Sequence, residues 1–149
     1  MGLEERLMAD LKEAMKSKDQ ASLRAIRAVK AAILLFKTDG SGKELDEASS
    51  IKLVQKLVKQ RQDSLDIYEK QGREDLAIIE REEIEVLQKY LPEQMGEAEL
   101  KAVISEIISS TGASSMKDMG RVMGAANAKL AGKADGKTIS VIVKELLTQ

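Results

Sequence analysis

The stretch Asp46–Lys70, DEASSIKLVQKLVKQRQDSLDIYEK, decides the fold class of this chain. Its apolar residues recur at steps of three and four, the spacing that puts side chains on one face of an α-helix. That face holds six residues: Ile51, Val54, Leu57, Val58, Leu65 and Tyr68. The spacing predicts a long helix that begins near Asp46 and packs this face against other helices.

Arg61 lies in the same face, where the spacing calls for an apolar side chain. A partly buried guanidinium is costly unless a carboxylate pairs with it. We therefore expect Arg61 to form a structural salt bridge rather than to contact a ligand. The acidic run at residues 80–85, EREEIE, is interpreted as a solvated helix face, because it shows no metal-ligand pattern of the calcium-loop type.

Helical spacing continues along almost the whole chain of 149 residues. Four longer patterns precede Pro92, the only proline, which ends the fourth because it lacks an amide donor. Three shorter patterns follow it. The sequence predicts an all-α protein with an N-terminal domain of about four helices, residues 1–91, and a C-terminal three-helix domain, residues 92–149.

The amino-acid composition excludes several kinds of functional site. The chain has no cysteine and no histidine, which removes thiol nucleophiles, disulfides, the usual zinc sites and imidazole bases. No apolar run approaches the roughly 20 residues that span a bilayer. The lack of cysteine is typical of cytosolic proteins. We therefore expect a soluble cytoplasmic protein that needs no membrane, cofactor or metal.

Net positive charge is concentrated in one segment of the chain. Residues 1–95 hold 17 Lys and Arg against 19 Asp and Glu, whereas residues 111–144 hold six against two. A local excess of cations beside helix ends suits a phosphate backbone. The predicted nucleic-acid contacts are the basic residues of this segment around its glycine-rich turns: Lys117, Arg121, Lys129, Lys133 and Lys137.

The turn at residues 132–138, GKADGKT, ends like a nucleotide-binding P-loop. That loop requires a glycine five residues before the Gly-Lys-Thr, after a buried strand. The required position holds Ala131, and the preceding segment resembles a helix end, so we predict no nucleotide binding. Structural roles in helix caps, turns and close helix packing are assigned to Gly120, Gly124, Gly132, Asp135 and Gly136.

Three stretches together resemble a known family. They are LRAIRAVKAAI at 23–33, the segment 59–95 that ends in YLPEQM, and the segment 111–147 that contains MGRVMG and GKADGK. They resemble the YqeY family, whose members carry the GatB/YqeY tail domain. One departure is that family members often have a proline and an extra lysine before the second turn, where this chain has Ala131.

The resemblance implies a helical N-terminal domain followed by a three-helix domain similar to the tail of the B subunit of glutamine-dependent aminoacyl-tRNA amidotransferase. In that enzyme the tail contacts transfer RNA and carries no chemistry. The implied partners are transfer RNA and an amidotransferase or another translation protein.

Three functions follow, in order of preference. The first is a non-catalytic tRNA-associated helper. The second is a protein-interaction scaffold with no RNA role, in which the long third helix offers its surface to a partner. The third is a carbon–nitrogen ligase with glutamine as nitrogen donor, and here the chain lacks any stand-alone catalytic constellation and could at most assist an amidotransferase.

Overall fold

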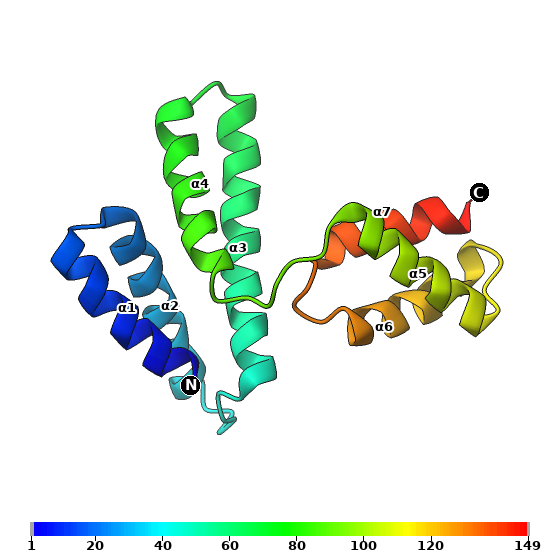
Figure 1. The fold of residues 1–149 in the computed structure, drawn as a ribbon, viewed down its shortest axis with the longest axis horizontal. Helices are drawn as coiled ribbons and strands as arrows, with labels where there is room; N and C mark the ends of the chain where they lie inside the picture. The colour runs from blue at the N-terminus through cyan, green and yellow to red at the C-terminus, as the bar shows by residue number, and fades with distance from the viewer. Residues whose placement is uncertain (1, 149) are drawn as a thin grey trace. The chain divides into compact units, whose positions relative to one another are not determined.

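The structure is a computed structural model that describes residues 2–148. Over these residues it is entirely helical, with no strand, so the prediction of an all-α protein is confirmed (Figure 1). A short 3₁₀ turn, Met116–Asp118, precedes the sixth of seven α-helices. The helices are α1 (Leu3–Ser17), α2 (Gln20–Thr38), α3 (Glu47–Lys70), α4 (Glu74–Gln88), α5 (Glu97–Thr111), α6 (Met119–Lys129) and α7 (Gly136–Leu147).

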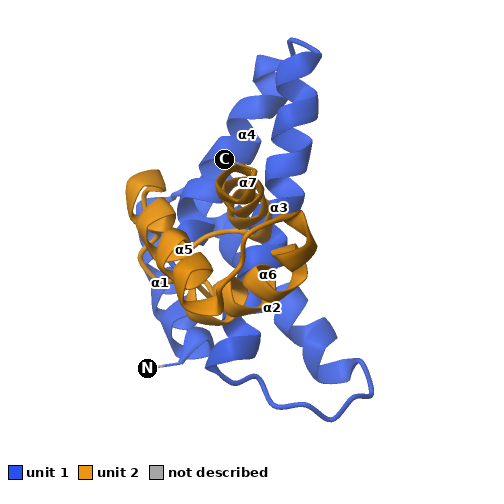
Figure 2. Ribbon diagram, turned by 90° about the vertical axis from the view of Figure 1, so that its right-hand side faces the viewer, with its two compact units in different colours: residues 1–91 blue, residues 92–149 orange. Residues whose placement is uncertain are grey.

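The chain divides into two compact units, Met1–Leu91 and Pro92–Gln149 (Figure 2). Unit 1 contains α1 to α4, and unit 2 contains α5 to α7. In unit 1, α1 and α2 form one hairpin and α3 and α4 another (Figure 1). No helix among the described residues is long and apolar enough to cross a membrane.

The helix α3 begins as its sequence predicts. The carboxylate of Asp46 accepts a hydrogen bond from the Ser49 amide at 2.8 Å and so caps the first turn. Its apolar face serves two clusters of unit 1. Val54 is fully buried in the main core, whereas Leu65 packs with Ala77 and Ile84 in a second cluster. One amphipathic face of α3 therefore contributes both to the main core of unit 1 and to the second cluster between α3 and α4.

The ion pairs of unit 1 confirm the expectation for Arg61. Its Nε lies 3.4 Å from the Glu83 carboxylate, and the two side chains are only 17% and 12% exposed. The interpretation of residues 80–85 as a solvated face is wrong at Glu83, whereas Glu82 pairs with Arg24 at 2.8 Å and keeps a side chain that is 45% exposed. The reason is that α4 packs against α2 and α3, and their arginines need these carboxylates.

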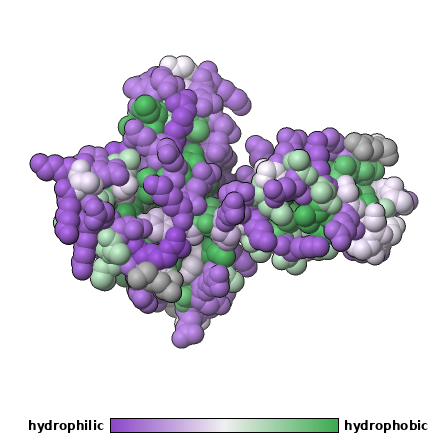
Figure 3. All heavy atoms as spheres, in the orientation of Figure 1, coloured by the Kyte–Doolittle hydropathy of each residue, from purple (hydrophilic) through white to green (hydrophobic). Residues whose placement is uncertain are grey.

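Unit 2 packs its three helices around a separate apolar core, whose members all come from residues after Pro92. The side chains of Ile104, Val122 and Val143, one from each helix, are fully buried. A capping box joins Ser115 and Asp118 before α6. Figure 3 shows that the visible surface of both units is mixed, with hydrophilic residues around smaller hydrophobic patches.

Candidate nucleic-acid interface

The corner between α6 and α7 contains the glycine-rich turn. Gly132 is buried and has a φ of +77°, a left-handed conformation that glycine adopts at little cost. Asp135 caps α7, since its carboxylate accepts a hydrogen bond from the Thr138 amide at 2.6 Å. Gly136 is the first residue of α7. The segment before Gly-Lys-Thr is thus a helix and a turn, not the strand that a P-loop requires.

The corner is fastened to the segment that follows Pro92. The Met95 amide donates a hydrogen bond to the Lys133 carbonyl at 3.0 Å. The side-chain amide of Gln94 donates to the Gly132 carbonyl at 2.7 Å. These bonds bring together two motifs, YLPEQM and GKADGK, that lie about 40 residues apart in the sequence. The backbone that carries Lys133 is therefore held in place.

Three lysines surround this fastened turn, and all three are exposed: Lys129, Lys133 and Lys137. Among residues 92–148, the ion pairs are made by Lys101 and Arg121 and by none of these three. Asp135 is the one carboxylate between them, so the segment from Lys129 to Lys137 carries a net charge of +2. A cluster of unpaired ammonium groups on a fixed backbone can bind an anion through Coulomb attraction.

The capping carboxylate changes how an anion would bind here. The positive end of α7 is already partly neutralised by Asp135, which accepts from the Thr138 amide. A phosphate close to this helix end would meet that negative charge. The lysine side chains, rather than the helix amides, are therefore the groups that can hold a phosphate at this corner.

The other two predicted cations lie at the opposite end of α6. Arg121 pairs with Asp118 at 3.1 Å, and its side chain is 57% exposed. Amide hydrogen bonds, first that from Ser114, lower the pKa of Asp118, so the pair stays charged at neutral pH. Lys129 lies eight positions after Arg121 on the helix, about 12 Å along the axis. The structure thus divides the five predicted cations into two groups. Lys129, Lys133 and Lys137 lie at the corner between α6 and α7, whereas Lys117 and Arg121 lie near the start of α6.

The two glycines of α6 lie within the helix and not in a turn. Gly120 and Gly124 are exposed, and a Cβ added at either one would meet no atom within 4 Å. The expected close approach of another helix is therefore wrong within residues 2–148. The reason is that α6 turns its other face, which includes Val122 and Ala126, toward the core of unit 2.

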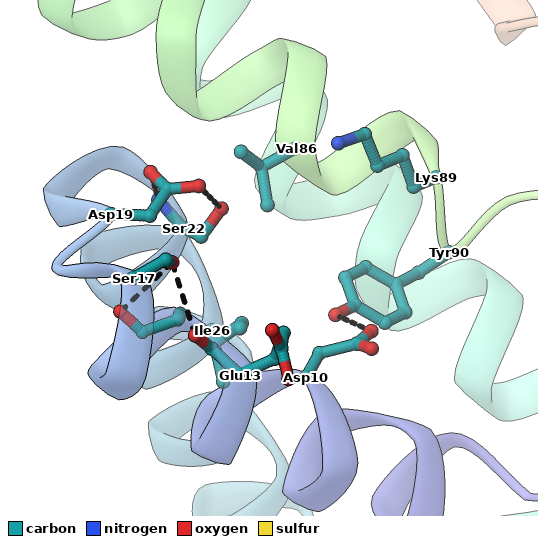
Figure 4. A pocket seen from close by; sticks show the side chains of 10 residues that line it. Asp10, Glu13, Ser17, Asp19, Ser22, Ile26, Val86, Lys89 and Tyr90 are labelled. Carbon is teal, nitrogen blue, oxygen red and sulfur yellow. Dashed lines mark hydrogen bonds between the residues drawn. The ribbon is translucent and has the colours of Figure 1, made fainter.

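A second concave feature, in unit 1, was not predicted from the sequence. It is a pocket of about 210 Å³ between α1, α2 and the end of α4, with Asp10, Glu13, Asp19 and Lys89 among its lining groups (Figure 4). The Tyr90 hydroxyl donates a hydrogen bond to Asp10. Sequence reasoning missed the pocket because its two halves lie about 70 residues apart and share no motif.

Three polar groups of this pocket, Asp10, Asp19 and Tyr90, already have structural partners. Asp19 caps α2 through Ser22, whose hydroxyl and amide lower the pKa of the Asp19 carboxyl. Burial, followed by the hydrogen bond to Asp10, raises the pKa of Tyr90, so the phenol stays protonated. The Arg6 guanidinium lies 5.1 Å from the centre of the Tyr90 ring. These contacts join α1 to the end of α4.

Comparison with protein families gives one match over nearly the whole chain. The model of the family described as "Yqey-like protein" matches residues 4–147. The chain belongs to the YqeY family. Both halves of the predicted organisation fall inside the match, so membership of the YqeY family applies to unit 1 and unit 2 alike.

Several fungal proteins are similar to this chain. "Altered inheritance of mitochondria protein 41, mitochondrial" of Pyrenophora tritici-repentis is 31% identical over 146 residues, 95% of this chain and 79% of that protein. The protein of the same name from Lachancea thermotolerans is 37% identical over 105 residues, 69% of this chain and 56% of that protein. The Candida glabrata protein is 41% identical over 88 residues, 58% and 48% respectively. The chain therefore spans about half to four fifths of these relatives.

The expectation of a cytoplasmic location is contradicted by these names. Each of the three relatives is named as a mitochondrial protein. The expectation rested on the absence of cysteine and of a membrane-spanning pattern. Both properties are shared by proteins of more than one aqueous compartment, so composition could not distinguish the cytoplasm from the mitochondrion.

Proposed function

We propose that this YqeY protein is a non-catalytic RNA-binding helper that contacts the phosphate backbone of transfer RNA through the α6–α7 corner. The observation that carries the proposal is the group of exposed lysines without ion pairs, Lys129, Lys133 and Lys137, around a turn held by backbone hydrogen bonds. Phosphate contacts supply most of the affinity of sequence-independent nucleic-acid binding.

Transfer RNA is the proposed RNA because unit 2 contains the motifs that resemble the tail of the amidotransferase B subunit. The names of the fungal relatives mention no nucleic acid, so this choice rests on the motifs and on the corner lysines. The two cations at the far end of α6, Lys117 and Arg121, are assigned a smaller share. Arg121 already has a carboxylate partner, which a phosphate would have to displace.

The proposal assigns the chain no bond-making step. Any carbon–nitrogen ligase chemistry would belong to an amidotransferase that the chain assists, with the chain presenting or retaining the RNA. The reason is that the side chains that usually act as nucleophile or base at neutral pH, cysteine and histidine, are absent from the sequence.

The test is a fluorescence-anisotropy titration of the full chain with unfractionated transfer RNA over a series of salt concentrations. The Lys129→Ala/Lys133→Ala/Lys137→Ala variant removes the corner group. Three phosphate contacts predict a slope of log affinity against log salt of about −2 to −3, and the variant should lose most of that slope. Its thermal stability should not change, because none of the three side chains makes an ion pair within residues 92–148.

The matched control removes three exposed lysines from unit 1 that make no ion pair among residues 2–148: Lys12, Lys16 and Lys30. This variant has the same change in net charge and should bind like wild type. Equal losses in both variants would mean that net charge, not the corner, drives association. No binding of wild type at low salt would reject the RNA proposal, and the scaffold alternative would then take first place.

A further inference from the structure

Unit 1 has an open groove between α2 and α3 that none of the contacts described so far explains. Its volume is about 590 Å³. The apolar part is formed by one stripe of α2 and one of α3: Ala32, Leu35, Phe36, Leu53 and Leu57. These residues recur at steps of one, three and four along each helix, so two neighbouring helices present apolar faces to the same space.

Apolar side chains of the groove remain open to solvent. Leu35 is 70% exposed, and Phe36 is half-buried. The α3 residues that line the groove run from Ser49 to Gln60, about 16 Å along the helix axis, or three turns. A trough of this length between two helices matches the size of one further amphipathic helix.

Lysines lie along the groove. Lys43, Lys52 and Lys56 line it, and none of them forms an ion pair among residues 2–148. Other lysines of the same unit do have partners: Lys37 lies 2.8 Å from Glu4, and Lys59 lies 3.9 Å from Asp63. The groove is therefore cationic as well as apolar.

A single carboxylate lines the groove, and it is occupied locally. Asp39 accepts hydrogen bonds from the amide and hydroxyl of Ser41, at 2.9 and 2.6 Å. These two bonds lower the pKa of Asp39. The lining thus carries three ammonium groups against one carboxylate, a net charge of +2.

We propose that this groove binds an acidic amphipathic helix of a partner protein. The apolar stripe of such a helix would cover Leu35 and Leu57, and carboxylates beside the stripe would pair with Lys52 and Lys56. An apolar floor does not suit the phosphates of RNA, which prefer a continuous cationic or hydrogen-bonding surface. The flat surface of a bilayer cannot fill a trough between two helices. Since the groove lies in unit 1, this proposal does not depend on RNA binding by unit 2.

The test uses two fluorescent peptides of about five helical turns with the same leucine stripe. In one peptide, glutamates flank the stripe, and in the other, lysines do. Each is titrated with the full chain by anisotropy near physiological salt, about 0.15 M. The acidic peptide should bind saturably in the micromolar range, and the basic peptide should bind at least about tenfold more weakly.

Two variants of the protein locate the site. Leu35→Glu places a charge on the apolar floor and should weaken the acidic peptide about tenfold or more. Lys52→Glu/Lys56→Glu should weaken it by a similar factor and improve the basic peptide. Leu35 is 70% exposed, so its substitution should leave the helical circular dichroism and the melting temperature of the chain unchanged.

The controls match each change outside the groove. Leu34→Glu alters a neighbouring leucine that is 63% exposed but does not line the groove. Lys12→Glu/Lys30→Glu, at two exposed lysines without ion pairs among residues 2–148, gives the same net charge as the lysine double variant. Both should bind the acidic peptide within about threefold of wild type.

The proposal would be overturned if the acidic peptide failed to saturate, or if both peptides bound equally well. It would also be overturned if groove and control variants lost the same affinity. A fourth contradicting result is that Leu35→Glu weakens binding of another partner and leaves binding of the acidic peptide unchanged. The last is checked with transfer RNA, with anionic phospholipid vesicles and by sedimentation of the chain alone. Loss of self-association in Leu35→Glu without peptide binding would assign the groove to a second copy of this chain.

Discussion

The two units of this protein use charge in different ways. In unit 1 ion pairs join one helix to another: Arg24 of α2 to Glu82 of α4, Arg61 of α3 to Glu83 of α4, and Lys37 of α2 to Glu4 of α1. In unit 2 one such pair is found among the described residues, Lys101 of α5 with Glu145 of α7 at 3.5 Å.

The difference separates structural charges from charges that are available for binding. A partly buried arginine needs its carboxylate, because an unpaired charge is poorly solvated away from water. An exposed lysine without a partner adds little to stability and can approach an anion without breaking an existing contact. The corner lysines of unit 2 belong to this second kind, and unit 1 contains both kinds, because its groove lysines are exposed and make no ion pair among residues 2–148.

The largest expected effect is a loss of stability, and it tests whether the two units unfold independently. Ile104→Ala removes a fully buried side chain from the core of unit 2 and should cost about 3 to 4 kcal/mol of its stability. Amide hydrogen exchange should then show weakened protection in α5 to α7 and native protection in α1 to α4. Val141→Ala, at a position 58% exposed, should cost less than about 0.5 kcal/mol. Loss of protection in both units together would show that they fold as one.

A smaller loss is expected when the charge network of unit 1 is broken. Glu83→Ala leaves Arg61, which is 17% exposed, without its carboxylate and should cost about 2 to 4 kcal/mol in urea unfolding. The matched change is Glu85→Ala, because Glu85 is exposed on the same helix. Equal costs for the two variants would mean that the network contributes nothing beyond an ordinary surface acid.

The smallest effect concerns Glu80 and depends on pH. Burial, and then repulsion from Glu83, raises the pKa of Glu80 above its ordinary value of 4.5. The folded state therefore binds this proton more tightly than the unfolded state does. Stability is lost as the pH rises from 4.5 through the raised pKa.

Glu80→Gln should thus raise the melting temperature at pH 7 and leave it unchanged about one unit below the ordinary pKa, where both states are protonated. Thermal unfolding at the two pH values measures the difference. Glu85→Gln, on the exposed side of α4, serves as the reference. A Glu80→Gln variant that is less stable than wild type at pH 7 would contradict the predicted sign.

The sequence was a good guide where a feature depends on near neighbours. The spacing in Asp46–Lys70 predicted α3, since the side chains of one helix face lie three or four residues apart, and the structure adds the cap that Asp46 supplies. It also predicted that Arg61 needs a carboxylate. It could not identify Glu83 as that partner, because residues 80–85 offer four acids and only packing selects between them.

The candidate sites, too, contain local features that the sequence predicts and features that only helix packing decides. The basic segment and its glycine-rich turn were visible in the sequence, because charge and turn residues are local properties. Only the structure separated Lys129, Lys133 and Lys137 from the Arg121–Asp118 pair. The α2–α3 groove was not predicted, since Leu35 and Leu53 lie on different helices and line the same space only through helix packing.

The sequence by itself determined that the chain is helical, where its long helix begins, and which segment carries excess positive charge. Each of these follows from interactions within a few residues, which the order of side chains along the chain specifies directly. Tertiary structure alone decided which carboxylates neutralise which arginines, which lysines stay unpaired, and where apolar side chains remain uncovered. Those outcomes depend on which helix faces meet, and that is set by the packing of the whole unit rather than by any single stretch.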